Sequence, residues 1–365
     1  MTLNTQKNAD SPSTATVDTF ASSGKNGGPY PNSNRSVMSL YRWLTAACSV
    51  VALAHPAFAQ AKADSVSLRF AWPIGMTARV DQEWTRMQVG PQRNDSVTVR
   101  SRYRLTVAAH PKGRLIQSDS FAITSLPAAA SNRRAGDVDP QQFLARLGSV
   151  QPSYVVTTDG EFVGLEGVER TKRMLDSLFA PMMREMADAP AELKALMQSV
   201  TSPQTLTATA AQEWNALAGT WVGADWVVGE AYEASSEEPS PMIPGLKVPM
   251  RHEFSAAERV PCREGEPAKR CIRLEMISEP DSAALRKVMT DFMAKVAPKD
   301  ANVAAAFQSM RVANELTVVA DPRDLRPYAM ALVKTVEVQG AGGPNEPAGR
   351  TRRVDIRTAR YRYVR

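Results

Sequence analysis

The chain has few of the residues and motifs that most often carry catalysis. It contains three histidines and three cysteines among 365 residues. The dinucleotide-binding G-x-G-x-x-G, the phosphate-binding G-x-x-x-x-G-K-S/T and the nucleophile elbow G-x-S-x-G are all absent. His110 and His252 each stand alone, without a second histidine at the short spacing of a zinc site. We therefore expect no catalytic residues, no bound metal and no cofactor.

Long apolar runs and a strong charge imbalance are also missing. After residue 59, no segment approaches the roughly 18 apolar residues that cross a bilayer as a helix. The formal net charge is +6, from 44 basic and 38 acidic residues, and this mild balance does not require a nucleic-acid partner. We expect no transmembrane segment in the mature chain and no nucleic-acid partner.

Residues 38–59 have the features of a secretory signal peptide. Arg42 supplies a short basic region, residues 44–54 are apolar, and Ala57-Phe58-Ala59 is a small-residue cleavage motif. We predict cleavage between Ala59 and Gln60, and a mature protein that is periplasmic or secreted.

Residues 1–37 precede this signal and are rich in serine, asparagine, threonine and glycine. Such a composition lacks the apolar residues of a core and predicts disorder. Because a signal peptide must lie near the start of a chain, we favour Met38 as the true start and residues 1–37 as a mis-assigned leader. A genuine extended leader is the alternative.

Two of the three cysteines, Cys262 and Cys271, follow the predicted cleavage site. They flank a charged segment, and the sequence on either side has the pattern of two strands. In an oxidising compartment this arrangement predicts a disulfide that closes a hairpin, because a redox-active pair usually has C-x-x-C spacing.

Alternation of apolar and polar residues predicts strands over most of the mature chain. In residues 97–107, valine, tyrosine and leucine alternate with arginine and threonine, which is typical of a strand with one buried face. Asp159-Gly160 between two apolar runs predicts a tight hairpin. Further strands are predicted at 66–72, 77–88, 114–123, 220–232, 246–254, on both sides of the cysteines, and at 315–320, 328–338 and 351–364, with a proline-rich loop at 235–244.

Two helical excursions near 166–218 and 281–311 interrupt the strands. In the first, leucine, phenylalanine and methionine recur at helical spacing, with Pro181 as a kink. In the second, the apolar stripe from Leu285 to Val296 lies opposite charged residues. Short helices are also predicted at 141–147 and 303–310.

Together these elements predict an α+β fold. Its main feature is a large curved antiparallel β-sheet of about ten strands, packed on the helical insertions. The sheet is expected to be antiparallel because the connections in the first third of the chain are too short for crossovers. Residues 60–365 would form one domain.

The order of elements resembles that of periplasmic lipoprotein carriers and of related uncharacterised secreted proteins with a curved β-sheet. The resemblance is carried by the opening meander from Val66, the hairpin at 154–160 and the turn Asp321-Pro-Arg-Asp-Leu-Arg-Pro. It implies a sheet wrapped around helices and a lipid or lipidated protein as partner. It assigns no functional residue in this chain.

Methionines gather in the predicted helices, and flexible thioethers suit irregular apolar surfaces and variable ligands. One interpretation is ordinary core packing. The other is a helical lid over the sheet that holds a lipid or acyl chain. For that lid we name these candidate ligand-binding residues: Phe179, Met182, Met186, Trp221, Trp226, Met289 and Met293.

Three functions are open on this sequence. The first is a non-enzymatic protein that binds a lipid, an acyl chain or a lipidated partner in a sheet–helix cavity. The second is a structural or protein-interaction module of the cell envelope without a small ligand. The third is a hydrolase with an unrecognised site, which would need a cleft that gathers His110 or His252 with carboxylates. The sequence does not define the oligomeric state.

Overall fold

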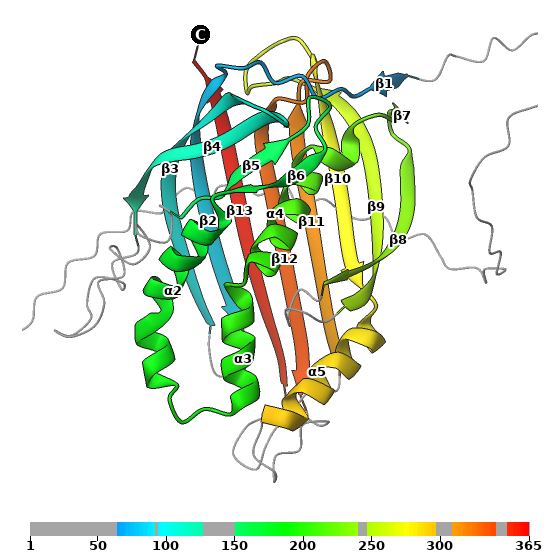
Figure 1. Cartoon of the computed structure of the whole chain (residues 1–365). Helices are drawn as coiled ribbons and strands as arrows, with labels where there is room; N and C mark the ends of the chain where they lie inside the picture. Colours follow the sequence, from blue (N-terminus) through cyan, green and yellow to red (C-terminus); the bar gives the residue numbers. More distant parts are fainter. Residues whose placement is uncertain are drawn as a thin grey trace, which may run out of the picture. The chain divides into compact units, whose positions relative to one another are not determined.

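A computed structural model of the chain describes residues 64–91, 94–126, 150–239, 247–296, 309–340 and 349–364 (Figure 1). Several predictions lie outside these residues. They are the leader at 1–37, the signal peptide at 38–59, the cleavage site between Ala59 and Gln60, the short helix at 141–147 and most of the one at 303–310.

The described residues form a large, open and curved antiparallel sheet of eleven strands, which confirms the predicted α+β class. Its strand order is β6-β5-β4-β3-β2-β13-β12-β11-β10-β9-β8. The strands are β2 (Thr77–Val89), β3 (Asn94–His110), β4 (Gly113–Ser125), β5 (Ser153–Val156), β6 (Phe162–Glu166), β8 (Ala231–Pro239), β9 (Lys247–Val260), β10 (Cys271–Pro280), β11 (Ser309–Ala320), β12 (Pro327–Gly340) and β13 (Gly349–Tyr363).

Two short strands, β1 (Ser65–Ser67) and β7 (Asp225–Val227), form a separate small sheet. The predicted first strand at 66–72 is therefore wrong beyond residue 67. Leu68, Phe70 and Trp72 are buried on alternate positions, as the pattern indicated, but no neighbouring strand pairs with them. Alternation reports which side chains are buried, and strand pairing needs a partner as well.

The helices lie on one side of the main sheet (Figure 1). They are α2 (Val168–Glu185), α3 (Ala191–Val200), α4 (Pro203–Leu217), the 3₁₀ turn η2 (Gly219–Trp221) and α5 (Ser282–Val296). Both helical excursions are thus present. Pro181 lies inside α2 without ending it. α4 begins after Ser202, whose hydroxyl accepts a hydrogen bond from the Thr205 N–H at 3.2 Å.

Each strand presents alternate residues to the two faces of the sheet. On β2, Ala78 and Val80 are buried, whereas Arg79 between them is exposed. We call the face that carries Val80 the inner face, because Val80 packs in one cluster with Trp214 of α4. The face that carries Arg79 is the outer face.

The inner face holds three hydrophobic clusters. The α4 core includes Trp72, Val80 and Trp214. The η2 core includes Trp221, Leu274 and Val318, and the α5 core is built by Leu285 with Val248 and Val312. The helices therefore contact the sheet in three places. This contact was expected, because the apolar faces of the helices must pack against another apolar surface.

The hairpin between β5 and β6 fixes α4 against the sheet edge. The Trp214 indole N–H donates a hydrogen bond to the Gly160 carbonyl at 2.7 Å. Gly160 has a φ of +94°, and a Cβ at this position would lie 2.7 Å from the Cβ and Cγ of Phe70. Both the backbone conformation and the close approach require glycine here.

The predicted strand at 220–232 is wrong as a single strand, since η2 ends at Trp221 and only β7 and the first two residues of β8 are strands within this range. Two further predictions need correction. Residues 235–239 belong to β8 and pair with β9, so the predicted loop begins too early. Ser309 and Met310 start β11, where the last turn of a helix was predicted. In both cases tertiary pairing overrides local composition. The predicted disulfide is confirmed, since Cys262 and Cys271 are bonded between the end of β9 and the start of β10.

Candidate functional site

A line of polar side chains crosses the inner face of the sheet. Each member is the direct cross-strand partner of the next, from β9 to β2. We call this set the polar row: His252, Ser278, Asn314, Lys334, Asp355 and Arg86. A continuous polar line is unexpected on a face that otherwise builds the core.

From β9 to β12, apolar side chains border the polar row on both sides. Residues two positions away along a strand share its face. On one side these are Phe254, Met276, Leu316 and Leu332, which belong to or pack on the η2 core. On the other side they are Met250, Val312 and Val336 of the α5 core. The polar row thus separates two apolar surfaces of the inner face.

At the β9 end the polar row is saturated with hydrogen bonds. The His252 ring is 8% exposed, and its Nδ1 lies 2.9 Å from Ser278 Oγ. Its Nε2 lies 2.9 Å from Ser236 Oγ and 3.0 Å from Glu238 Oε1. With the proton on Nε2, the ring accepts from Ser278 and donates to Glu238. Both candidate histidines therefore lie near a carboxylate, since His110 Nε2 is 3.7 Å from Glu166 Oε2.

At the β2 end one carboxylate serves two arginines. Asp355 accepts a hydrogen bond from Arg86 Nε at 2.6 Å and another from Arg353 Nε at 2.8 Å. The Arg86 guanidinium also lies over the Trp84 ring, 4.7 Å from its centre. Both oxygens of Asp355 are used by these contacts.

Lys334, in the middle of the polar row, is left without a counter-ion. Among the described residues its ammonium group has no hydrogen bond and no ion pair. Burial lowers the pKa of Lys334, and the Arg353 charge lowers that pKa further, whereas Asp355 opposes them. This lysine is partly shielded from water and close to more positive than negative charge.

A second buried polar group lies next to the polar row, under α4. Arg357 approaches Glu213 of α4 at 3.8 Å, and the Tyr154 hydroxyl donates to Glu213 at 3.0 Å. The Nε of Arg357 is buried and has no hydrogen-bond partner among the described atoms. Burial, and then the Glu213 charge, raises the pKa of Tyr154 far above its ordinary value.

In the part of the chain that the structure describes, helices do not cover the inner face beside these groups. α2 packs on α4, and α3 packs on α4 and α5. Within the described residues, neither α2 nor α3 contributes to the three cores. Accordingly, residues 81–88 of β2 and 328–338 of β12 all stay partly exposed in the middle of the sheet. Trp84, Leu332 and Lys334 are among these residues.

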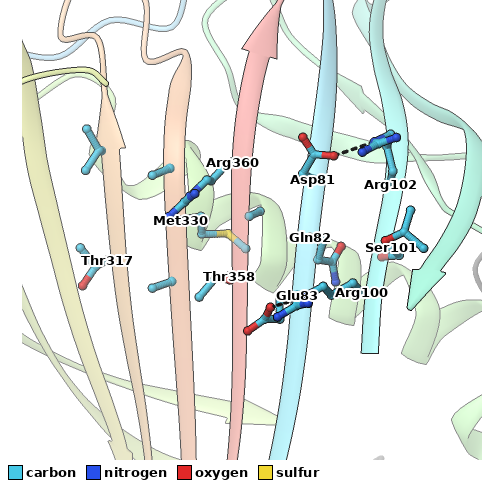
Figure 2. Close-up of a pocket in the computed structure, with 15 residues that line it drawn as sticks. Asp81, Gln82, Glu83, Arg100, Ser101, Arg102, Thr317, Met330, Thr358 and Arg360 are labelled. Carbon is cyan, nitrogen blue, oxygen red and sulfur yellow. Dashed lines mark hydrogen bonds and ion pairs between the residues drawn. The ribbon is translucent and has the colours of Figure 1, made fainter. Parts of the chain in front are cut away.

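A shallow depression of about 540 Å³ lies on the outer face, across β11 to β4 (Figure 2). Small residues such as Thr317, Ala331 and Thr358 line it, next to ion pairs of Asp81 with Arg102 and of Glu83 with Arg100, both at 2.6 Å. The depression is open and wide, and its charges are largely satisfied within the protein.

Ion pairs with carboxylates on neighbouring strands also neutralise most of the arginines on β3 and β13. Arg100 and Arg102 face carboxylates directly across the strand pair, and Arg104 pairs with Asp119 of β4 at 2.8 Å. On β13, Arg350 and Arg352 share Glu337. A sequence shows a run of arginines, but only the register shows which of them are neutralised.

The seven predicted ligand-binding residues do not form one site. Trp221 is fully buried and Trp226 is 7% exposed, so both rings belong to the η2 core and offer no surface to a ligand. Met289 packs on the α5 core. Met182 of α2 is 36% exposed, and Phe179 of α2 is partly exposed. Met186, directly after α2, and Met293 on α5 are also partly exposed.

The members of the polar row other than His252 were not found from the sequence. Lys334 and Asn314 are single polar residues in apolar strand patterns, Asn314 for example between Val312 and Leu316, whereas Asp355 stands between two arginines. That interruption is the available signal, and it is weak in any one strand. Only the pairing of six strands shows that the interruptions align.

No protein-family model matches the chain, and no curated protein is detectably similar to it in sequence. Within the described ranges, no helix is long and apolar enough to span a membrane. The same residues contain no group of three or more histidine, cysteine and acidic side chains placed to hold a metal ion.

Proposed function

We propose that the protein is a non-enzymatic protein of the cell envelope that binds a lipid, an acyl chain or a lipidated partner. The ligand surface is the inner face of β2, β13 and β12, on the side of α2 and α3. The observation that carries the proposal is that apolar side chains such as Trp84 and Leu332 stay partly exposed in the middle of the sheet. Exposed apolar surface of this kind marks binding sites.

Three features of the sequence support this proposal. The signal-peptide pattern at 38–59 would direct the chain to the periplasm or outside the cell. The Cys262–Cys271 disulfide suits that environment. The resemblance to periplasmic lipoprotein carriers points to the same class of ligand.

The test is native mass spectrometry of the protein, expressed as the full chain in a bacterium and purified from the envelope fraction. We expect adducts with the mass of a lipid or an acylated peptide, or uptake of lipid on incubation. Leu332→Asn should reduce the adducts, whereas Ala331→Asn, one residue away on the outer face, should not. An adduct-free protein that takes up no lipid contradicts the proposal and favours an interaction module.

A second candidate function is hydrolysis, favoured by the alignment of Ser278, His252 and Glu238. A catalytic triad has a serine on one ring nitrogen and a carboxylate on the other. Here Ser278 is at Nδ1 and Glu238 at Nε2, the reverse of the serine-protease arrangement. Ser278 is only 6% exposed, so a substrate would have to reach it along the inner face. Labelling by a fluorophosphonate that is lost in Ser278→Ala would support hydrolysis, and absence of labelling in the folded protein would exclude this serine as a nucleophile.

A further inference from the structure

We propose that the ligand of the inner face is an acyl chain that ends in a carboxylate, and that Lys334 binds this carboxylate. The inference rests on the function proposed above and adds the chemical class of the ligand to it. Its basis is a charge that the fold places on an apolar, partly exposed surface without a counter-charge.

The register explains why Lys334 has no counter-charge. Asp355 lies directly opposite Lys334 on β13, where a cross-strand ion pair would normally form. Its two oxygens instead accept hydrogen bonds from Arg86 and Arg353. On the other side, the partner of Lys334 is Asn314 of β11, whose amide also makes no hydrogen bond to a described residue. The ammonium group of Lys334 and the amide of Asn314 thus lie side by side, and neither makes a hydrogen bond to a described residue.

The surrounding charges favour an anion. Among the described residues, two carboxylates, Asp355 and Glu213, stand against four cationic side chains on this part of the inner face: Arg86, Lys334, Arg353 and Arg357. The Arg357 Nε is a buried donor without an acceptor. An unpaired charge is far less well tolerated in such a shielded environment than in water. A bound carboxylate would supply an acceptor for the Lys334 ammonium group.

The neighbours of Lys334 on the same face argue for an amphiphile rather than a free anion. Leu332 lies two residues before it and Val336 two residues after it, and both pack beside apolar cores. A small hydrophilic anion would neutralise Lys334 but leave this apolar surface in water. A hydrocarbon chain covers it, at about 0.8 kcal/mol for each buried methylene.

The experiment compares decanoate with decanol, which has the same chain length and no charge. Binding to the full-length protein is measured by titration calorimetry below micelle concentrations. We expect decanoate to bind about tenfold more tightly than decanol, as a charge-assisted hydrogen bond would give. Lys334→Met should remove this preference. Lys287→Met, an exposed lysine of α5, is the matched control.

The outcomes separate the two proposals. Equal binding of decanoate and decanol to the wild type overturns the role of Lys334 but leaves the apolar ligand surface standing. Failure of both to bind overturns the proposed function as well. Because the comparison of the two ligands uses the wild type, it does not depend on the stability of the variant. Acetate serves as a further probe, and tight acetate binding would show a simple anion site and contradict the acyl ligand.

Discussion

At Lys334 the fold shields a cation from water without giving it an ion pair among the described residues. The pKa of Lys334 is lowered by burial, so the unfolded chain binds more protons than the folded one between that pKa and 10.5. The free energy of unfolding should therefore rise with pH across this window. The charged groups that face Lys334 are Asp355 and the arginines beside it, above all Arg353.

Replacing Lys334 with methionine should stabilise the protein at pH 7. We expect a gain on the order of 1 kcal/mol, because the variant removes an unpaired, shielded charge and keeps the chain length. The gain should shrink as the pH rises toward 10.5. Urea unfolding at several pH values measures it, with Lys287→Met as the control. A loss of stability at pH 7, or a gain independent of pH, would contradict this account.

Gly160 gives a second prediction for a single residue. Gly160→Ala would strain a positive φ and press a methyl group against Phe70, whereas Gly167 has a φ of +68° and open space around it. We expect Gly160→Ala to destabilise the protein by about 1–3 kcal/mol more than Gly167→Ala, since only the first overpacks the core. Thermal unfolding of the two variants tests this, and equal losses would show that the contact with Phe70 relaxes.

On the scale of elements, the hairpin of β9 and β10 is held by the Cys262–Cys271 disulfide and a small cluster around it. Val260 and both cysteines are buried together, with Val319 and Tyr328 against them. The bond thus supports a hairpin whose strands also carry His252 and Ser278 of the polar row.

Removal of this disulfide should weaken the fold without abolishing it. The double variant Cys262→Ala, Cys271→Ala is expected to lose roughly 2.5–3 kcal/mol, the chain-entropy value for a loop of about ten residues. Urea unfolding with and without reductant is the measurement. Reductant should lower the midpoint of the wild type only, and an unchanged wild-type midpoint would show that the bond is dispensable.

On the scale of the whole molecule, the signal-peptide prediction decides where the fold begins. Export should yield a mature protein that starts at Gln60, because Ala57 and Ala59 are the small residues that signal peptidase requires. The intact mass of the exported protein tests this. Ala59→Tyr should block cleavage at this site, and a secreted product that still contains residue 38 would refute the prediction.

Most of the architecture could be predicted because its signals are local. A two-residue period marks β2, β3, β12 and β13, and a helical period marks α2 and α5. The errors fall where a segment depends on a distant partner. Residues 68–72 look like a strand but pair with no described strand, whereas residues 235–239 look like a loop and pair with β9.

The candidate site could not be predicted in the same way. The methionines and tryptophans singled out from the sequence are apolar residues, and composition cannot distinguish a core residue from a ligand contact. Trp221 proved to be core, while Leu332 and Trp84, which the sequence did not single out, line the partly exposed inner face.

The sequence by itself determined the periodicities, the fold class and the pairing of two cysteines, because each depends on residues close together in the chain. Only the tertiary structure decided the polar row and the isolation of Lys334. The alternation within a strand sets which face a residue occupies, but not which residue of another strand it meets. The ion pair of Arg86 with Asp355 joins residues 269 positions apart, and it is this contact that takes the counter-charge from Lys334.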